Sequence, residues 1–163
     1  MAESASGLIL RMTRTFDAAP DRVFAAWTDA RQFGAWFGPA GMKTVSCEVD
    51  ARVGGVWRLI GEGRDIPGSS RPGELIRPTV SGRYLEIEPP RRLVFTFAWH
   101  EKDDFASPRG AETIVTIQFK PAGKRTEMVF TQAVFTDQPA LAAHDEGWTG
   151  SFDKLRDLLG QTR

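Results

Sequence analysis

The chain has 163 residues, of which 41% are hydrophobic, and this size favours one compact domain with a single core. Its 21 basic and 21 acidic residues give no net charge, which argues against nucleic acid or an anionic membrane as the main partner. No run of about 18 apolar residues is present, and residues 1–10 lack the features of a secretory signal, so we expect a cytoplasmic protein without membrane insertion.

The first predicted elements are a strand and two short helices. Alternating hydrophobicity predicts a strand over residues 8–16, after a lead at 1–7 that we expect to fray. Pro20 suits the first turn of a helix that runs to Trp27, and a second short helix follows. Because Pro39 cannot continue a helix, Trp36 and Phe37 are expected at a helix end.

Period-2 patterns separated by Gly and Pro turns predict an antiparallel meander. Large apolar residues alternate through Phe97 and Trp99, which requires a buried sheet face. Residues 61–78 are too long and too rich in Gly, Pro, Ser and Arg for a simple turn, and two alternatives stay open, a functional lid or an insertion without function. The strands are predicted at 42–50, 56–60, 79–88, 93–100, 112–120 and 126–135.

The last predicted element is an amphipathic helix over residues 141–159, with Asp137 as its N-cap. Its apolar stripe is expected to face the sheet, and a long helix across a curved sheet of aromatic strands suggests a hollow domain. Gly147 and Gly150 each cost about 1 kcal/mol relative to Ala inside a helix, which favours close packing or a kink. A kink at Gly147 would aim Trp148 inward.

Cysteine and histidine are scarce. Cys47 is the only cysteine, which excludes an internal disulfide, and its position in step with Val45 and Val49 favours a buried, inert thiol. His100 and His144 are the only histidines, and neither has a second ligand at metal-binding spacing. We therefore expect neither a metal nor another cofactor.

Four stretches carry a resemblance to a known family: APDRVFAAW at 19–27, DARVGG at 50–55, EIEPP at 86–90 and GW at 147–148. In this order and spacing they resemble the SRPBCC superfamily, and more narrowly the bacterial homologues of the C-terminal domain of the heat-shock chaperone ATPase activator. That branch belongs with the START and birch-pollen-allergen group. The resemblance covers nearly the whole chain.

The resemblance implies one α+β domain over residues 1–163 with a helix-grip fold. In this fold a curved antiparallel sheet of about six to seven strands wraps around the long C-terminal helix, and two short helices follow the first strand. A cavity lies between sheet and helix, and its mouth is closed by the short helices and loops. Residues 65–78 exceed the short link expected in the family at this point.

Aromatic and apolar residues predicted to point inward either line such a cavity or fill a core. His144, one turn before Trp148, is expected either to reach the cavity with Tyr84 or Glu86 as its partner, or to be solvated near the helix start. His100 and the acidic run that follows it are expected in a solvated loop. The candidate ligand-binding residues are Trp36, Phe37, Trp57, Leu59, Tyr84, Phe95, Phe97, Trp99, Val115, Ile117, His144, Trp148 and Phe152.

Three functions are compatible with these features. The first is binding of an apolar small molecule, lipid-like, aromatic or polyketide-like, in the internal cavity. The second is a protein-interaction module with a chaperone or another protein as partner, which the resemblance suggests. The third is cyclase or hydrolase chemistry in the same cavity, although no catalytic triad or metal motif is present and no catalytic residue is assigned.

Overall fold

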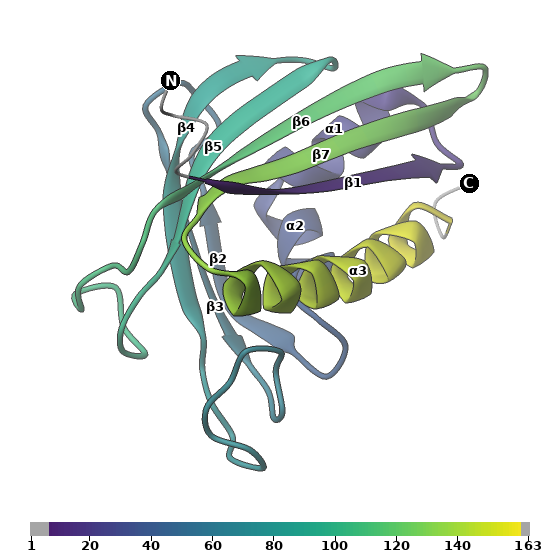
Figure 1. Cartoon of the computed structure of the whole chain (residues 1–163). Coiled ribbons are helices and arrows are strands. Elements are labelled where there is room, and N and C mark those ends of the chain that lie inside the picture. Colours follow the sequence, from purple (N-terminus) through teal and green to yellow (C-terminus); the bar gives the residue numbers. More distant parts are fainter. Residues whose placement is uncertain (1–6, 161–163) are drawn as a thin grey trace.

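The computed structural model describes residues 7–160 and contains seven strands and three helices (Figure 1). The expected fraying at 1–7 therefore falls, apart from Gly7, outside the described residues. The strands are β1 (Leu8–Phe16), β2 (Lys43–Val49), β3 (Val56–Glu62), β4 (Thr79–Glu88), β5 (Arg92–Trp99), β6 (Thr113–Ala122) and β7 (Arg125–Phe135), and the helices are α1 (Pro20–Thr28), α2 (Ala30–Trp36) and α3 (Gln138–Gly160).

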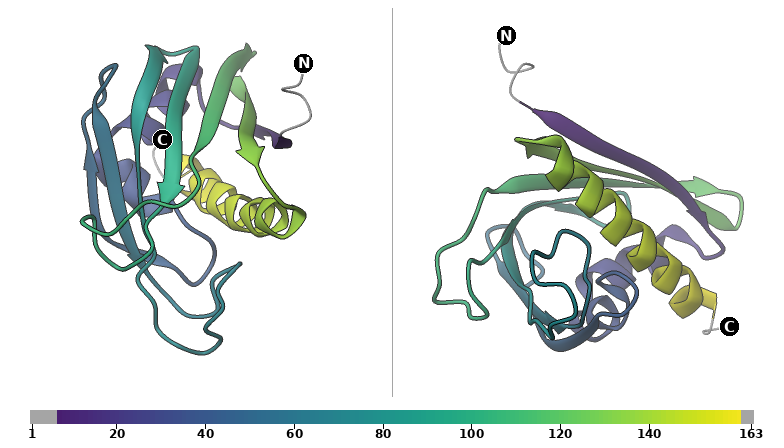
Figure 2. Two further views of the ribbon diagram at one scale, coloured as in Figure 1. Left: turned by 60° about the vertical axis from the view of Figure 1, so that its left-hand side comes forward. Right: turned by 60° about the horizontal axis from the view of Figure 1, so that its bottom comes forward.

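The strands form one antiparallel sheet in the order β1-β7-β6-β5-β4-β3-β2. Strands β2 to β7 follow one another as a meander, and β1 pairs with β7 from Leu8↔Phe135 to Phe16↔Thr126. Two short helices after the first strand, a curved seven-stranded sheet and a long C-terminal helix confirm the predicted helix-grip architecture. Figure 2 shows the sheet curving around α3.

The side chains of β2 do not alternate as strictly as the sequence pattern predicts. A register shift between Thr44 and Ser46 interrupts its pairing with β3, and Val45 is 50% exposed. Cys47 and Val49 pack against the core but are only partly buried, so the expectation of a buried thiol is met in part. The expectation that Val45 shares their buried face is therefore wrong, because a bulge places an extra residue in the strand and breaks the strict alternation.

Helix α3 is continuous across both of its glycines. Asp137 caps it, since its Oδ1 accepts a hydrogen bond from the Ala140 N–H at 2.8 Å. The predicted stripe is buried at Trp148, Phe152, Leu155 and Leu159. The helix thus crosses the concave face of the sheet as one continuous element (Figure 2).

The centre of the domain is filled by aromatic rings around Trp27 of α1. Its indole lies 4.6 Å from the ring of Trp36, 5.8 Å from Trp148 and 6.1 Å from both Phe95 and Phe152, measured between centroids. Such ring pairs contribute beyond their area burial, and dense packing of this kind leaves little internal space. The deep interior between sheet and helix is therefore densely packed with aromatic rings.

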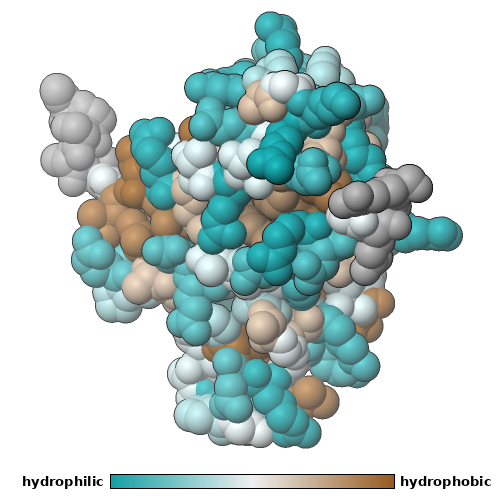
Figure 3. All heavy atoms as spheres, turned by 90° about the vertical axis from the view of Figure 1, so that its right-hand side faces the viewer, coloured by the Kyte–Doolittle hydropathy of each residue, from teal (hydrophilic) through white to brown (hydrophobic). Residues whose placement is uncertain are grey.

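Most of the face seen in Figure 3 is hydrophilic, with apolar colour in a few separate areas. Among the exposed apolar side chains are Ile9, Ile114 and Val134, on the neighbouring strands β1, β6 and β7. Within residues 7–160, no helix has both the length and the apolar character needed to cross a membrane.

Candidate ligand pocket

An open pocket of about 530 Å³ lies at one end of the core, where α3 begins. We call it the main pocket. Its walls are the first half of α3, the segment that follows α2, the ends of β4 and β5, and the loop between β3 and β4. Figure 1 shows this β3–β4 loop projecting from the sheet near the start of α3.

Five of the predicted ligand-binding residues line the main pocket: Phe37, Phe97, Trp99, His144 and Trp148. Phe37, Phe97 and Trp148 are at most 3% exposed and form an aromatic floor. The ring of Trp148 contacts Phe37 edge-on at 5.5 Å and Phe97 at 5.9 Å. Residues from a helix end, a strand and a helix thus meet at one apolar surface.

The other eight predicted residues do not line this pocket and belong to the packed core. Each is at most 3% exposed. Their rings contact one another, for example Trp57 with Phe95 at 5.5 Å and Tyr84 with Phe95 at 6.0 Å. The structure therefore separates the predicted set into pocket and core, with the core containing Trp36, Trp57, Leu59, Tyr84, Phe95, Val115, Ile117 and Phe152.

His144 is held by two hydrogen bonds that fix its protonation state. Its Nδ1 lies 2.8 Å from the Ala140 carbonyl oxygen, which can only accept, and its Nε2 lies 3.0 Å from the Trp99 indole N–H, which can only donate. The ring is therefore neutral, with its proton on Nδ1. Burial also lowers the pKa of His144 below its usual value.

The partners expected for His144 are engaged elsewhere. Glu86 pairs with Arg92, whose Nε donates to Glu86 Oε1 at 2.9 Å, and Tyr84 packs in the core. His144 is also not a solvated residue. Its true partner, Trp99, lies on β5, a contact that depends on how far α3 is shifted along the sheet and that no sequence pattern reports.

A buried polar chain supports the aromatic floor. Trp148 Nε1 donates to Gln132 Oε1 at 2.8 Å, and Gln132 Nε2 donates to Thr113 Oγ1 at 2.8 Å. The Thr113 hydroxyl in turn donates to the Phe97 carbonyl oxygen at 3.1 Å. Because Gln132 is fully buried, these bonds satisfy groups that would otherwise be costly to bury, and they fix the orientation of Trp148.

The segment after α2 is fastened to α3 on the opposite wall. Gly38 N–H donates to Ser151 Oγ at 2.9 Å, and Lys154 Nζ lies 3.2 Å from the Met42 carbonyl oxygen. At Gly150 an added Cβ would come within 3.0 Å of the Ala40 nitrogen. The expectation that a helix glycine permits close approach is thus confirmed at Gly150, which lets this wall lie directly on the helix.

The β3–β4 loop forms the outer wall. It remains paired at its base, where Gly63 and Ile76 exchange two backbone hydrogen bonds of 3.0 and 2.9 Å. Residues 66–71 then line the main pocket, and an added Cβ at Gly68 would lie 3.1 Å from the Ala143 Cβ on α3. This part of the segment therefore lies directly against the main pocket and α3.

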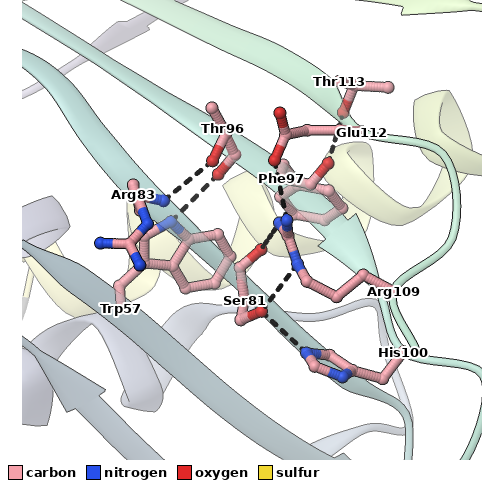
Figure 4. Close-up of polar contacts among 9 residues, drawn as sticks. All are labelled: Trp57, Ser81, Arg83, Thr96, Phe97, His100, Arg109, Glu112 and Thr113. Atoms are coloured by element: carbon pink, nitrogen blue, oxygen red, sulfur yellow. Dashed lines mark hydrogen bonds and ion pairs between the residues drawn. The ribbon is translucent and has the colours of Figure 1, made fainter. Parts of the chain in front are cut away.

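His100 joins a polar cluster on the outer side of the sheet rather than a solvated loop (Figure 4). Its Nδ1 donates to the Ser107 carbonyl oxygen at 3.0 Å, and in this tautomer its Nε2 accepts from the Ser81 hydroxyl at 2.8 Å. Arg109 donates to both Ser81 Oγ and the Ser81 carbonyl, at 3.1 and 2.8 Å. The expectation of a solvated loop is confirmed for the acidic run, since residues 101–104 are exposed, but it is wrong for His100, which is partly buried where the loop bonds back to β4.

A serine beside a histidine is also the arrangement of a hydrolytic nucleophile and its base. Ser81 is only 7% exposed, however, and its hydroxyl oxygen is already occupied by Arg109. Figure 4 shows Arg109 in turn paired with Glu112, whose carboxylate lies 2.8 Å from its guanidinium. This cluster therefore serves to anchor the loop over residues 100–112.

The comparisons with known proteins agree with the observed fold. Residues 17–160 match the family model described as "Activator of Hsp90 ATPase homolog 1-like protein". No curated protein matches the sequence.

Solved structures share the fold over nearly the whole chain. The AHSA1 protein of Silicibacter pomeroyi is 30% identical, with a TM-score of 0.80 over 96% of this chain and 100% of that one. Protein CV1439 of Chromobacterium violaceum is 26% identical, with a TM-score of 0.72 over 95% and 97% of the two chains. Protein Ms6760 of Mycobacterium smegmatis, at 19% identity and a TM-score of 0.76 over 96% and 93%, shows the fold alone. Both the family match and the helix-grip architecture lead to one assignment: the chain belongs to the family of Activator of Hsp90 ATPase homolog 1-like proteins, within the SRPBCC superfamily.

Proposed function

We propose that this protein binds a small apolar molecule in the main pocket. The observation that carries the proposal is the contrast between two glycines of α3. An added Cβ at Gly150 would press on the neighbouring backbone at 3.0 Å, whereas at Gly147 it would meet no atom within 4 Å. Gly147 lines the main pocket. Glycine at this position costs the helix about 1 kcal/mol relative to alanine, and the missing side chain leaves the adjoining part of the main pocket open.

The dimensions and chemistry of the pocket support the proposal. A volume of about 530 Å³ lies within the roughly 300–1,000 Å³ typical of small-molecule sites. The floor is aromatic, and polar side chains such as Ser69, Arg71 and Asp103 come from the loops around it. Because His144 is neutral and both of its nitrogens are occupied, it adds no charge to the floor. An apolar or aromatic ligand with a polar end fits this distribution.

The test is a titration with N-phenyl-1-naphthylamine, a neutral probe whose fluorescence rises in apolar surroundings. The wild type and the variant Gly147→Leu are compared, because Gly147 lines the main pocket and an added Cβ there would meet no atom within 4 Å. Glu146→Leu is the matched control, since it adds the same side chain on the exposed side of α3.

We expect saturable binding to the wild type and to Glu146→Leu, and at least a tenfold loss of affinity in Gly147→Leu. The fold of each variant is checked by amide NMR. Equal binding by wild type and a folded Gly147→Leu would overturn the proposal, as would no binding by the wild type.

A further inference from the structure

A second, smaller pocket lies behind the main pocket. We call it the rear pocket; its volume is about 180 Å³, roughly a third of that of the main pocket. It lies between the end of β7, the residues just before β6 and the first turn of α3, where Phe135 and Ala111 are among its lining residues. Like the main pocket, it is lined mainly by apolar and aromatic side chains.

The two pockets share four lining residues: Phe97, Trp99, Ala140 and His144. Trp99 reaches in from β5 and His144 from α3, and their side chains meet in the 3.0 Å hydrogen bond. The His144 ring also packs on Phe135 at 4.8 Å. The hydrogen-bonded pair therefore stands between the pockets and joins the sheet to the helix.

We infer that the Trp99–His144 pair is a partition that limits the length of the bound molecule, and that without it the two pockets form one elongated cavity. This inference rests on the proposed function. According to this inference, the wild type binds a compact apolar ligand, such as a ring system or a short chain. A variant that lacks the partition binds a longer chain. His144 acts here as a specificity-determining residue.

The construction of the partition supports this role. Both nitrogens of His144 are used, so its ring is held in one orientation by groups on α3 and on β5. Its imidazole is smaller than the neighbouring rings, and its removal would leave Phe97 as a floor shared by both pockets. A buried apolar chain gains about fourfold in affinity for each methylene that it places in such a cavity.

The experiment measures how binding depends on chain length. Linear 1-alkanols from 1-hexanol to 1-hexadecanol displace N-phenyl-1-naphthylamine from the wild type, His144→Ala and His144→Phe. Affinity should rise with each methylene until the cavity is filled and then level off. Neutral alkanols avoid any effect of charge on the comparison.

We expect the plateau to move to longer alkanols by two or more methylenes in His144→Ala, which is at least about a sixteenfold gain for the longest chains. It should stay in place in His144→Phe, which keeps the bulk of the ring. Adding Ala111→Phe to His144→Ala should restore the short plateau, because residue 111 is exposed and lines only the rear pocket. If His144→Ala does not fold, Trp99→Leu removes the other half of the partition.

The failures are distinguishable. If the wild type does not bind N-phenyl-1-naphthylamine, the proposed function fails. If it binds the probe but no alkanol displaces the probe, the partition is overturned while the proposed function stands. If alkanols displace the probe but the plateau is the same in wild type and His144→Ala, the partition is overturned while ligand binding stands. A plateau that also lengthens in His144→Phe, or that Ala111→Phe leaves unchanged, likewise overturns it.

Discussion

The buried chain from Trp148 to Gln132 allows a quantitative test of what holds the pocket floor. Gln132→Leu keeps most of the side-chain volume but removes the acceptor of the Trp148 indole N–H. Gln132 is fully buried. A buried donor without a partner costs about 1–3 kcal/mol. The Thr113 hydroxyl keeps the Phe97 carbonyl as its acceptor, so it adds little. We expect Gln132→Leu to lower the free energy of unfolding by about 1–3 kcal/mol.

A double-mutant cycle isolates this interaction. Trp148→Phe removes the donor, so combining it with Gln132→Leu should cost less than the two single changes added together, by at least about 1 kcal/mol. Urea unfolding of the four proteins, followed by far-ultraviolet circular dichroism, gives the required free energies without relying on Trp148 fluorescence. Additivity within about 0.5 kcal/mol would refute the claim that this hydrogen bond stabilises the floor.

Three further predictions concern α3 and β2. Gly147→Ala should raise the free energy of unfolding by about 0.5–1 kcal/mol, since its Cβ meets open space, whereas Gly150→Ala should lower it; urea unfolding giving the same sign at both positions would contradict the structure. Burial, with the nearby charges of Glu48 and Asp29, raises the pKa of Cys47 from 9.0 to about 11. Its reaction with a disulfide reagent at pH 8 should therefore be about a hundredfold slower in folded than in urea-unfolded protein, and equal rates would argue against this burial. Because the pKa of His144 is lowered in the folded state, the unfolded chain binds more protons, so the free energy of unfolding is full above about pH 6.5 and falls as the pH drops toward the folded pKa. His144→Phe should remove this part of the pH dependence of the free energy of unfolding, and an unchanged dependence would count against a neutral His144.

The architecture was predictable because local signals agree with one another along the chain. Pro20 begins α1, Asp137 caps α3, and the alternation through Phe97 and Trp99 marks a buried strand face. Each of these signals acts over a few residues, so tertiary context had little opportunity to override it. The exception, Val45, lies at a bulge, where pairing with β3 rather than local pattern decides which side chain turns outward.

The division between pocket and core could not be predicted in the same way. Trp57 and Phe97 both alternate inward on their strands, yet only Phe97 reaches the main pocket. The Trp57 ring is enclosed by Phe33 and Phe95, at 5.8 and 5.5 Å, whereas Phe97 lies toward the end of β5, 5.9 Å from Trp148. Period-2 alternation gives the face of a sheet and not the depth along it. The Trp99–His144 contact depends in the same way on the relative positions of distant elements.

Some signals for the missed pocket residues were nevertheless present. The length of the β3–β4 loop marked it as unusual and left a functional lid and an insertion without function both open, and its residues 66–71 form the outer wall. Gly147 and Gly150 were marked together as unusual in a helix, and the structure gives them opposite environments. Sequence alone could not distinguish a glycine that makes room for a neighbouring backbone from one whose added Cβ would meet open space.

The most direct test of the central claim is a two-dimensional amide NMR titration of the labelled protein with N-phenyl-1-naphthylamine. Ligand binding in the main pocket predicts saturable shifts of the Gly68, Arg71 and Gly147 amides and of the Trp99 indole N–H, all of which belong to residues that line it. Shifts confined to the opposite side of the sheet, around Ile9 and Ile114, or no shifts at all, would contradict it.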